Sequence, residues 1–131
     1  MRILLQRVSK ASVSIEGKEI STIKGGYLAL VGIGEDDQPE VALAMAEKVK
    51  VLRVFGDSQG KMNLSITDVG GEILSVSQFT LYADTRKGRR PSFTQAAGTQ
   101  KGQEIYQQFN QALINEGITV KTGVFGADMQ V

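Results

Sequence analysis

The stretch Tyr27-Leu28-Ala29-Leu30-Val31-Gly32-Ile33-Gly34 is the longest apolar run of the chain, and it directly follows the pair Gly25-Gly26. A short apolar run bounded by glycines is typical of a β-strand that is buried on both faces. We therefore expect these residues to form a central strand of a sheet. The run is far shorter than the roughly 20 apolar residues that a membrane-spanning helix needs, so we expect no membrane partner.

The residues before this run have the pattern of antiparallel sheet. Apolar and β-branched side chains alternate over residues 2–16, which predicts a strand that bends near Ser9-Lys10. A turn at residues 16–18 then leads to a second short strand over residues 20–23. The opening third of the chain is therefore predicted to be antiparallel.

A helix is predicted to begin in the segment Asp36-Asp37-Gln38-Pro39-Glu40. The two aspartates are candidate N-cap residues, proline is accepted in a first helical turn, and Glu40 is placed for a capping box. No further ligands accompany the aspartates, so we interpret them as a cap and not as a metal site. The predicted buried face consists of apolar residues at helical spacing: Val41, Met45, Val49 and Leu52.

The rest of the chain alternates strand and helix. A second helix is predicted over residues 99–115, with Gly117 as its stop. Its apolar stripe consists of Ile105, Phe109 and Leu113. Strands are predicted over residues 61–64, 72–82 and 118–125. The order of elements indicates one domain over residues 1–131 of the α+β class, with a mainly antiparallel or barrel-like sheet and two helices packed on it.

The composition excludes whole classes of chemistry. The chain contains no cysteine and no histidine, so it has no thiolate nucleophile, no imidazole base, no thiolate ligand for zinc and no imidazole metal ligand. An enzyme with this sequence must use backbone donors, hydroxyls, amides, carboxylates, lysine, arginine or a group of its substrate. We expect no metal, no cofactor and a cytoplasmic location. The net charge is only +1, so contact with a polyanion requires a local basic patch.

The predicted strand over residues 72–82 is a candidate site. Its polar side chains at Ser77, Gln78 and Thr80 lie on both faces, where core residues are expected. They are either structural residues of a central strand or a site at which a hydroxyl and an amide meet a substrate carbonyl. Without a base, the Thr80 hydroxyl is a poor nucleophile, so positioning and oxyanion stabilisation are favoured over attack.

A basic segment follows, with Arg86, Lys87, Arg89 and Arg90 grouped around Gly88. Such a run is usually a solvated loop. For a polyanionic substrate it becomes a clamp for backbone phosphates, which provide affinity that depends on salt and little on sequence.

Several segments together resemble the D-aminoacyl-tRNA deacylase family, in register from the first residues to the last. They are Gln6-Arg7-Val8, Ala11-Ser12-Val13, Phe55-Gly56-Asp57, Gly60-Lys61-Met62-Asn63-Leu64, Ser77-Gln78-Phe79-Thr80-Leu81, Ala83-Asp84, Arg90-Pro91-Ser92-Phe93, Thr122-Gly123 and Phe125-Gly126-Ala127-Asp128-Met129-Gln130-Val131.

The resemblance implies a sheet-rich homodimer with its active site at the subunit interface. It implies hydrolysis of the ester that joins a D-amino acid, or glycine mischarged on tRNA-Ala, to the 3′ end of tRNA in translation proofreading. The implied catalytic residues are Ser77, Gln78, Phe79 and Thr80. In one view of the family's mechanism Thr80 is the nucleophile. In the other, main-chain groups such as the Phe79 N–H act with the 2′-hydroxyl of the terminal adenosine, and the composition favours this second view.

The resemblance also implies binding residues. Phe125, Met129, Gly102 and Arg7 are candidates for the substrate pocket. Core packing is the alternative for Phe125 and Met129, and a structural ion pair is the alternative for Arg7. The basic segment becomes a clamp for the acceptor end of tRNA. The alternative function is a non-catalytic module that binds tRNA or other RNA.

The sequence departs from the family at its end. Family members continue past the Ala-Asp-Met-Gln-Val segment into a strand and a Gly-Pro motif with a cis peptide bond, which reaches into the partner's site and excludes L-amino acids. This chain stops at Val131, and its two prolines follow Gln38 and Arg90. Two interpretations are open: the sequence is truncated before the motif, which we favour because the preceding residues match the family so closely, or the protein lacks the motif. No residue of this chain is assigned to the exclusion of L-amino acids.

Overall fold

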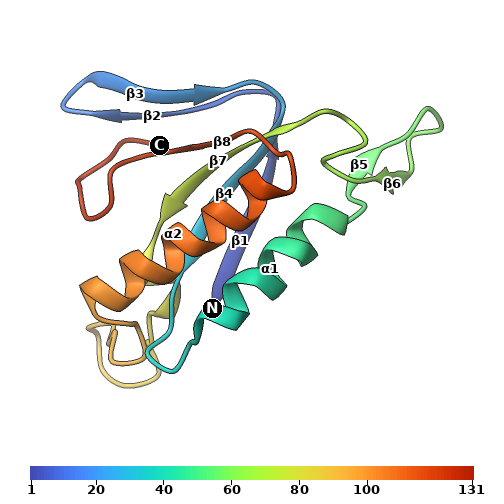
Figure 1. Ribbon diagram of the computed structural model, residues 1–131. Helices are drawn as coiled ribbons and strands as arrows, with labels where there is room; N and C mark the ends of the chain where they lie inside the picture. Colours follow the sequence, from blue (N-terminus) through green and yellow to red (C-terminus); the bar gives the residue numbers. More distant parts are fainter.

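The computed structural model describes residues 1–131, and it is organised around a four-stranded sheet in the order β1-β4-β7-β8 (Figure 1). These strands are β1 (Arg2–Val8), β4 (Gly26–Gly32), β7 (Glu72–Ser77) and β8 (Val120–Thr122). One face is covered by the helices α1 (Pro39–Val51) and α2 (Thr99–Asn115). The other face carries the hairpin of β2 (Ala11–Ile15) and β3 (Lys18–Ile23). The predicted α+β class, with two helices packed on sheet, is confirmed.

The apolar run that begins at Tyr27 forms β4, an inner strand of the sheet, as its sequence predicts. Tyr27, Ala29 and Val31 are fully buried on the face that the helices cover. Leu28 and Leu30 are half-buried and point to the opposite face. Both faces of this strand therefore contribute to a hydrophobic core, which explains why its sequence is apolar at nearly every position.

The four-stranded sheet is mixed, and it does not close into a barrel. β1 pairs with β4 in antiparallel orientation, whereas β4 with β7 and β7 with β8 are parallel pairs. Parallel neighbours need a long crossover, which α1 and α2 supply. Among the strands, antiparallel pairing occurs in β1–β4, in β2–β3 and in the small hairpin of β5 (Phe55–Gly56) and β6 (Met62–Leu64). Three isolated bridges are antiparallel as well. The chain bends as predicted between Val8 and Ala11.

Helix α2 matches its prediction. It spans Thr99–Asn115, and its stripe of Ile105, Phe109 and Leu113 is buried. Gly117 follows the helix with φ +86°, a conformation that suits glycine at a helix end. Neither helix combines the length and apolar character that crossing a membrane requires.

Helix α1 differs from its prediction at the cap. Its N-cap is Gln38, which makes no side-chain cap bond, and Pro39 opens the first turn. The predicted aspartate cap is therefore wrong, because the Asp37 carboxylate turns back and accepts the N–H of Gly34 at 2.7 Å. The most buried residues of the helix are small or β-branched: Ala42, Ala46 and Val49. The predicted positions Val41, Met45 and Leu52 are only half-buried.

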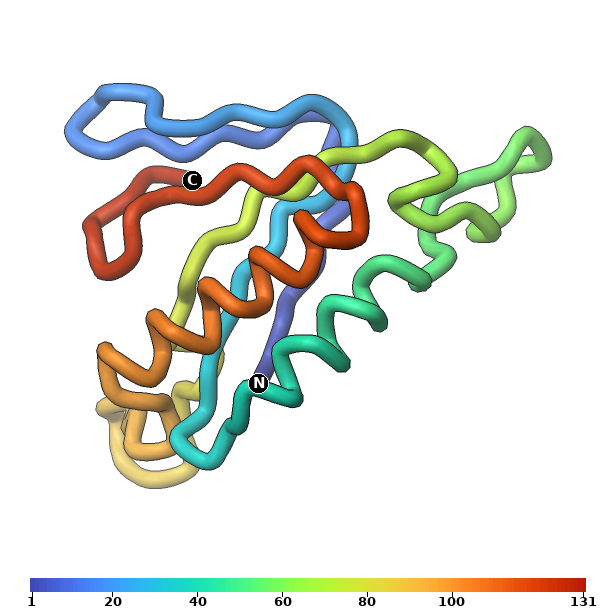
Figure 2. Tube along the Cα trace, viewed as in Figure 1, coloured from blue at the N-terminus to red at the C-terminus, as the bar shows by residue number.

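The predicted strand over residues 72–82 is two elements in the structure. β7 ends at Ser77, and a 3₁₀ turn, η1 (Phe79–Tyr82), replaces its second half. The N–H of Gln78 still donates to Val31 of β4 at 2.8 Å, which is the last rung of the ladder. The chain then turns away and passes beneath the start of α2 (Figure 2). The polar residues of this segment therefore lie at the end of a strand, where a turn exposes them.

Candidate active site

A pocket of about 340 Å³ opens at the carboxyl end of β7. Its lining includes Ser77 and Phe79 on one side, the first turn of α2 with Gly98, Thr99 and Gly102, and the turn at Phe125. Two predicted catalytic residues and two predicted substrate-binding residues therefore share one cavity. Gly102 and Phe125 face each other across it, and a Cβ atom at Gly102 would lie 3.7 Å from the Phe125 ring.

The pocket exists because β8 ends before β7 does. Ser75 is the last residue of β7 that pairs with β8, opposite Thr122. The carbonyl of Ser75 accepts the phenol of Tyr106 at 2.7 Å, and the Tyr106 ring packs against Phe125 at 5.9 Å between centroids. Beyond this point the Ser77 N–H faces no strand, so a donor is left unpaired at the pocket wall.

The turn that follows adds two more donors and a polar pair. The N–H groups of Phe79 and Thr80 open the 3₁₀ turn, where a helix has no internal acceptors. The Gln78 side-chain amide donates to the Thr80 hydroxyl. This is the only hydrogen bond of the Thr80 side chain, which is exposed and does not line the pocket. Thr80 therefore has no base beside it.

Phe79 is an exposed aromatic residue at the rim of the pocket. Its side chain is 55% exposed, and its ring meets that of Phe93 edge to face at 5.1 Å. The two rings lie at opposite ends of the segment that contains the basic residues. They present an apolar surface between the pocket and that segment.

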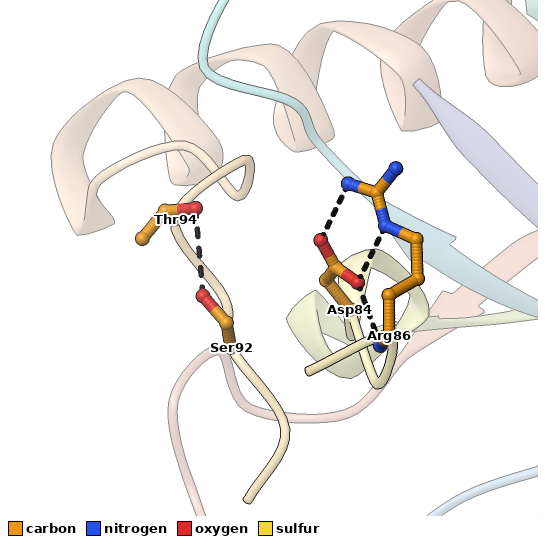
Figure 3. A network of polar contacts seen from close by, with 4 residues as sticks. All are labelled: Asp84, Arg86, Ser92 and Thr94. Atoms are coloured by element: carbon orange, nitrogen blue, oxygen red, sulfur yellow. Dashed lines mark hydrogen bonds and ion pairs between the residues drawn. The ribbon is translucent and has the colours of Figure 1, made fainter. Parts of the chain in front are cut away.

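The basic residues lie on a loop that is closed by two backbone hydrogen bonds of 2.8 Å between Asp84 and Ser92. The Arg86 side chain is 80% exposed, and its guanidinium donates to the Asp84 carboxylate through contacts of 3.0 and 2.7 Å (Figure 3). These side-chain hydrogen bonds, with a backbone N–H of Arg86, lower the pKa of Asp84 to about 2. The cations of the loop without an ion pair are Lys87, Arg89 and Arg90.

Two predicted binding residues lie away from the pocket. Arg7 is paired with Tyr27 near the far end of the sheet, and its guanidinium donates to the carbonyl of Val54 at 2.6 Å. Met129 packs on the β2–β3 side of the sheet, in the cluster around Val13. Within one chain, neither Arg7 nor Met129 lines the pocket that contains Ser77.

One wall of the pocket was not predicted from the sequence. Ala97, Gly98 and Thr99 precede or begin α2 and carry no reactive group. Small residues at the start of a helix are common in sequences, so they do not by themselves indicate a pocket. Long-range contacts with the residues after β4 bring this segment to the pocket: Ala96 bridges Gly34, and the Ala97 N–H donates to the carbonyl of Ile33 at 2.9 Å.

Comparison with known proteins places this geometry in a family. The model of the family D-Tyr-tRNA(Tyr) deacylase matches residues 4–131. A protein of Exiguobacterium sp. called D-aminoacyl-tRNA deacylase is 55% identical over 131 residues, which are 100% of this chain and 89% of that protein. A protein of Listeria monocytogenes with the same name is 56% identical over 131 residues, 100% of this chain and 87% of the relative.

Two solved structures share the fold. One, described as c-Myc DNA Unwinding Element Binding Protein, has a TM-score of 0.92 and 39% identity, and the match covers 99% of this chain and 89% of that chain. The other, described as a probable eukaryotic D-amino acid tRNA deacylase, has a TM-score of 0.82 at 16% identity, covering 98% and 91%, and shows the fold alone. From the family match over residues 4–131 and relatives more than half identical along its whole length, the chain belongs to the D-Tyr-tRNA(Tyr) deacylase family.

Proposed function

We propose that this protein hydrolyses the ester that joins a D-amino acid, or glycine, to the 3′-terminal adenosine of tRNA, and so acts in translation proofreading. Membership of the family supports the reaction class. The observation that carries the proposal is the pocket at the end of β7, where the Ser77 N–H has no strand partner and the η1 turn begins. A site of this kind suits a small acyl group whose carbonyl oxygen needs donors.

The proposed mechanism uses main-chain donors and a hydroxyl of the substrate. Water adds to the ester carbonyl, and the developing oxyanion is stabilised by N–H groups at Ser77 and Phe79. In other enzymes, a donor of this kind is worth roughly a hundredfold or more in rate. The 2′-hydroxyl of the terminal adenosine lies beside the ester and orients the water, and the 3′ oxygen then leaves with a proton. Gln78 and Thr80 hold the substrate in place.

The loop over residues 84–92 is proposed to hold the acceptor end of the tRNA. Lys87, Arg89 and Arg90 are exposed and have no carboxylate partner. Phosphate contacts position a nucleic acid without reading its sequence, which suits an enzyme that accepts tRNAs of several kinds. A tRNA substrate also implies a cytoplasmic location.

A second copy of the chain is proposed to complete the protein as a homodimer. β1 is an edge strand, and its Leu4 is 55% exposed. Leu4 alternates with inward-facing residues and so shares a face with the half-buried Leu28 and Leu30 of β4. The β2–β3 hairpin packs over β7 and β8 and leaves the part of this face near β1 open. Arg7 and Met129 remain predicted substrate-binding residues.

The decisive experiment compares release of amino acid from D- and L-aminoacyl-tRNA by the purified protein. We expect turnover of the D substrate, and a large loss of turnover when the terminal nucleotide is 2′-deoxy. Thr80→Val removes the hydroxyl and keeps the shape, so we expect a modest fall in kcat if Thr80 only positions the substrate. Complete loss in Thr80→Val would instead support a threonine nucleophile. Binding of tRNA without any turnover would refute the proposed activity.

A further inference from the structure

We infer that Arg2 is a positioning residue for this site: it holds the η1 turn against the end of β4 and so sets the direction of the Phe79 and Thr80 N–H groups. The inference rests on the proposed function, because the turn that Arg2 contacts carries the Phe79 N–H, one of the two donors assigned there to the oxyanion. Arg2 itself lies on β1 and lines no part of the pocket.

The Arg2 side chain crosses over Gly32 of β4 to reach the η1 turn. Arg2 is the cross-strand partner of Gly32. Its Nη1 donates to the carbonyl of Leu81, in the middle of η1, at 2.8 Å. Its guanidinium carbon also lies 4.5 Å from the centre of the Tyr82 ring. A charged donor on a backbone carbonyl and a cation over an aromatic face both restrain the turn.

Two glycines let the turn lie directly on β4. A Cβ at Gly34 would come within 2.9 Å of the Tyr82 hydroxyl, and a Cβ at Gly32 within 3.1 Å of both the Leu81 side chain and the Gln78 carbonyl. Neither glycine has a positive φ, so close approach is what requires them. Tyr82 is only 8% exposed in the resulting slot.

The turn has little support of its own. Its neighbouring backbone hydrogen bonds are local: the Leu81 N–H donates to Gln78 at 3.3 Å and the Ala83 N–H to Thr80 at 3.0 Å. β7 has already ended at Ser77, so no ladder continues through the turn. The Gln78 N–H anchors the start of the turn to Val31 at 2.8 Å, and Arg2 and the Tyr82 slot are the contacts that hold the rest of the turn to the sheet. A displacement of about 1 Å at such a site can cost roughly a hundredfold in rate.

The first test separates orientation from binding. Arg2→Met removes the charge and the donor but keeps the length, and we expect kcat to fall roughly ten- to a hundredfold with KM unchanged. Arg2→Lys keeps a cation over Tyr82 and a donor for Leu81, and we expect it to recover most of the loss. A wild-type kcat in Arg2→Met, or an equal loss in both variants, would overturn the inference.

The second test does not depend on activity. Amide hydrogen exchange at Leu81 and Ala83 should accelerate in Arg2→Met, while exchange at Phe109 in the core stays as in the wild type. Gly34→Ala should have the same local effect because its Cβ displaces Tyr82, whereas the control Gly56→Ala should not, since nothing lies within 4 Å of a Cβ there.

The outcomes of the exchange test are distinct from those of the proposed function. If wild-type protein releases no amino acid, the proposed activity fails and the exchange data still decide whether Arg2 restrains the turn. Unchanged exchange at Leu81 and Ala83, or an equal rise at Phe109, would overturn the inference whatever the activity.

Discussion

At the scale of single residues, Gly102 is predicted to set the space available to the acyl group. It lies in the first turns of α2, is buried, and faces Phe125 across the pocket. A glycine inside a helix costs roughly 1 kcal/mol relative to alanine, which indicates that this position favours space over helix stability. A Cβ would make only ordinary contact with Phe125, at 3.7 Å.

We therefore expect Gly102→Ala to raise the free energy of unfolding by roughly 0.5–1 kcal/mol and to slow hydrolysis of substrates with bulky side chains. The reason is that the added methyl group supports the helix and narrows the pocket. Urea unfolding and kcat/KM for glycyl- and D-tyrosyl-tRNA measure the two effects. Faster turnover of the larger substrate would contradict this role of Gly102.

Asp84 provides a prediction about pH. Its pKa is about 2 because the hydrogen bonds that Arg86 donates, and the positive charge of its guanidinium, stabilise the carboxylate. The usual pKa of an aspartate in an unfolded chain is about 3.9. A lowered pKa means that the folded pair is favoured above about pH 4 and is lost as the pH falls through 2. NMR titration of the Asp84 carboxyl should show a midpoint near 2 that rises in Arg86→Met. A midpoint near 4 in the wild type would show that the pair does not form in solution.

At the scale of elements, the loop closed by Asp84 and Ser92 divides its cations into two kinds. Arg86 is bound to Asp84, whereas Arg89 and Arg90 have no partner. An arginine that already has a carboxylate partner contributes less binding free energy on contact with a phosphate than an arginine without one. The four basic residues, equivalent in the sequence, are therefore not equivalent in the structure.

Replacing Arg89 and Arg90 by alanine should weaken tRNA binding and flatten its dependence on salt. Each lost phosphate contact lowers the slope of log K against log salt by about 0.7 to 0.9, so the double variant should lose roughly 1.5. Arg86→Ala should change both quantities less, and it serves as the matched comparison. Filter binding over a range of salt concentrations gives the slopes. Equal effects of Arg86→Ala and either single variant, Arg89→Ala or Arg90→Ala, would show that the ion pair with Asp84 does not restrict Arg86.

At the scale of the whole molecule, the open part of the sheet predicts self-association. Leu4→Glu places a charge on the face proposed for the second copy, and we expect the dimer to dissociate in light scattering coupled to gel filtration. Leu43 is 61% exposed on α1, away from this face, so Leu43→Glu should leave the mass unchanged. A dimer that survives Leu4→Glu and dissociates in Leu43→Glu would assign the interface to the helices.

Much of the architecture could be predicted because it depends on local patterns. The apolar run from Tyr27, the stripe of Ile105, Phe109 and Leu113, and the stop at Gly117 follow from periodicity and from the conformational freedom of glycine. The residue types of Ser77 to Thr80 indicated a segment whose polar groups need partners, either as structural residues or as a site. Its assignment as the site came from the family resemblance and stays a prediction. Local sequence carries this information because burial repeats every two residues in a strand and every 3.6 in a helix.

Tertiary structure decided the rest, because it depends on which distant segments become neighbours. The parallel pairing of β7 depends on its neighbours β4 and β8. The turn Phe79–Tyr82 packs on Gly32, Gly34 and Arg2, which are far away in the sequence. The absence of histidine and cysteine, by itself, restricted the chemistry to backbone, hydroxyl and substrate groups. The early end of β8 then left the Ser77 N–H unpaired beside a pocket, and no local pattern encodes where a neighbouring strand stops.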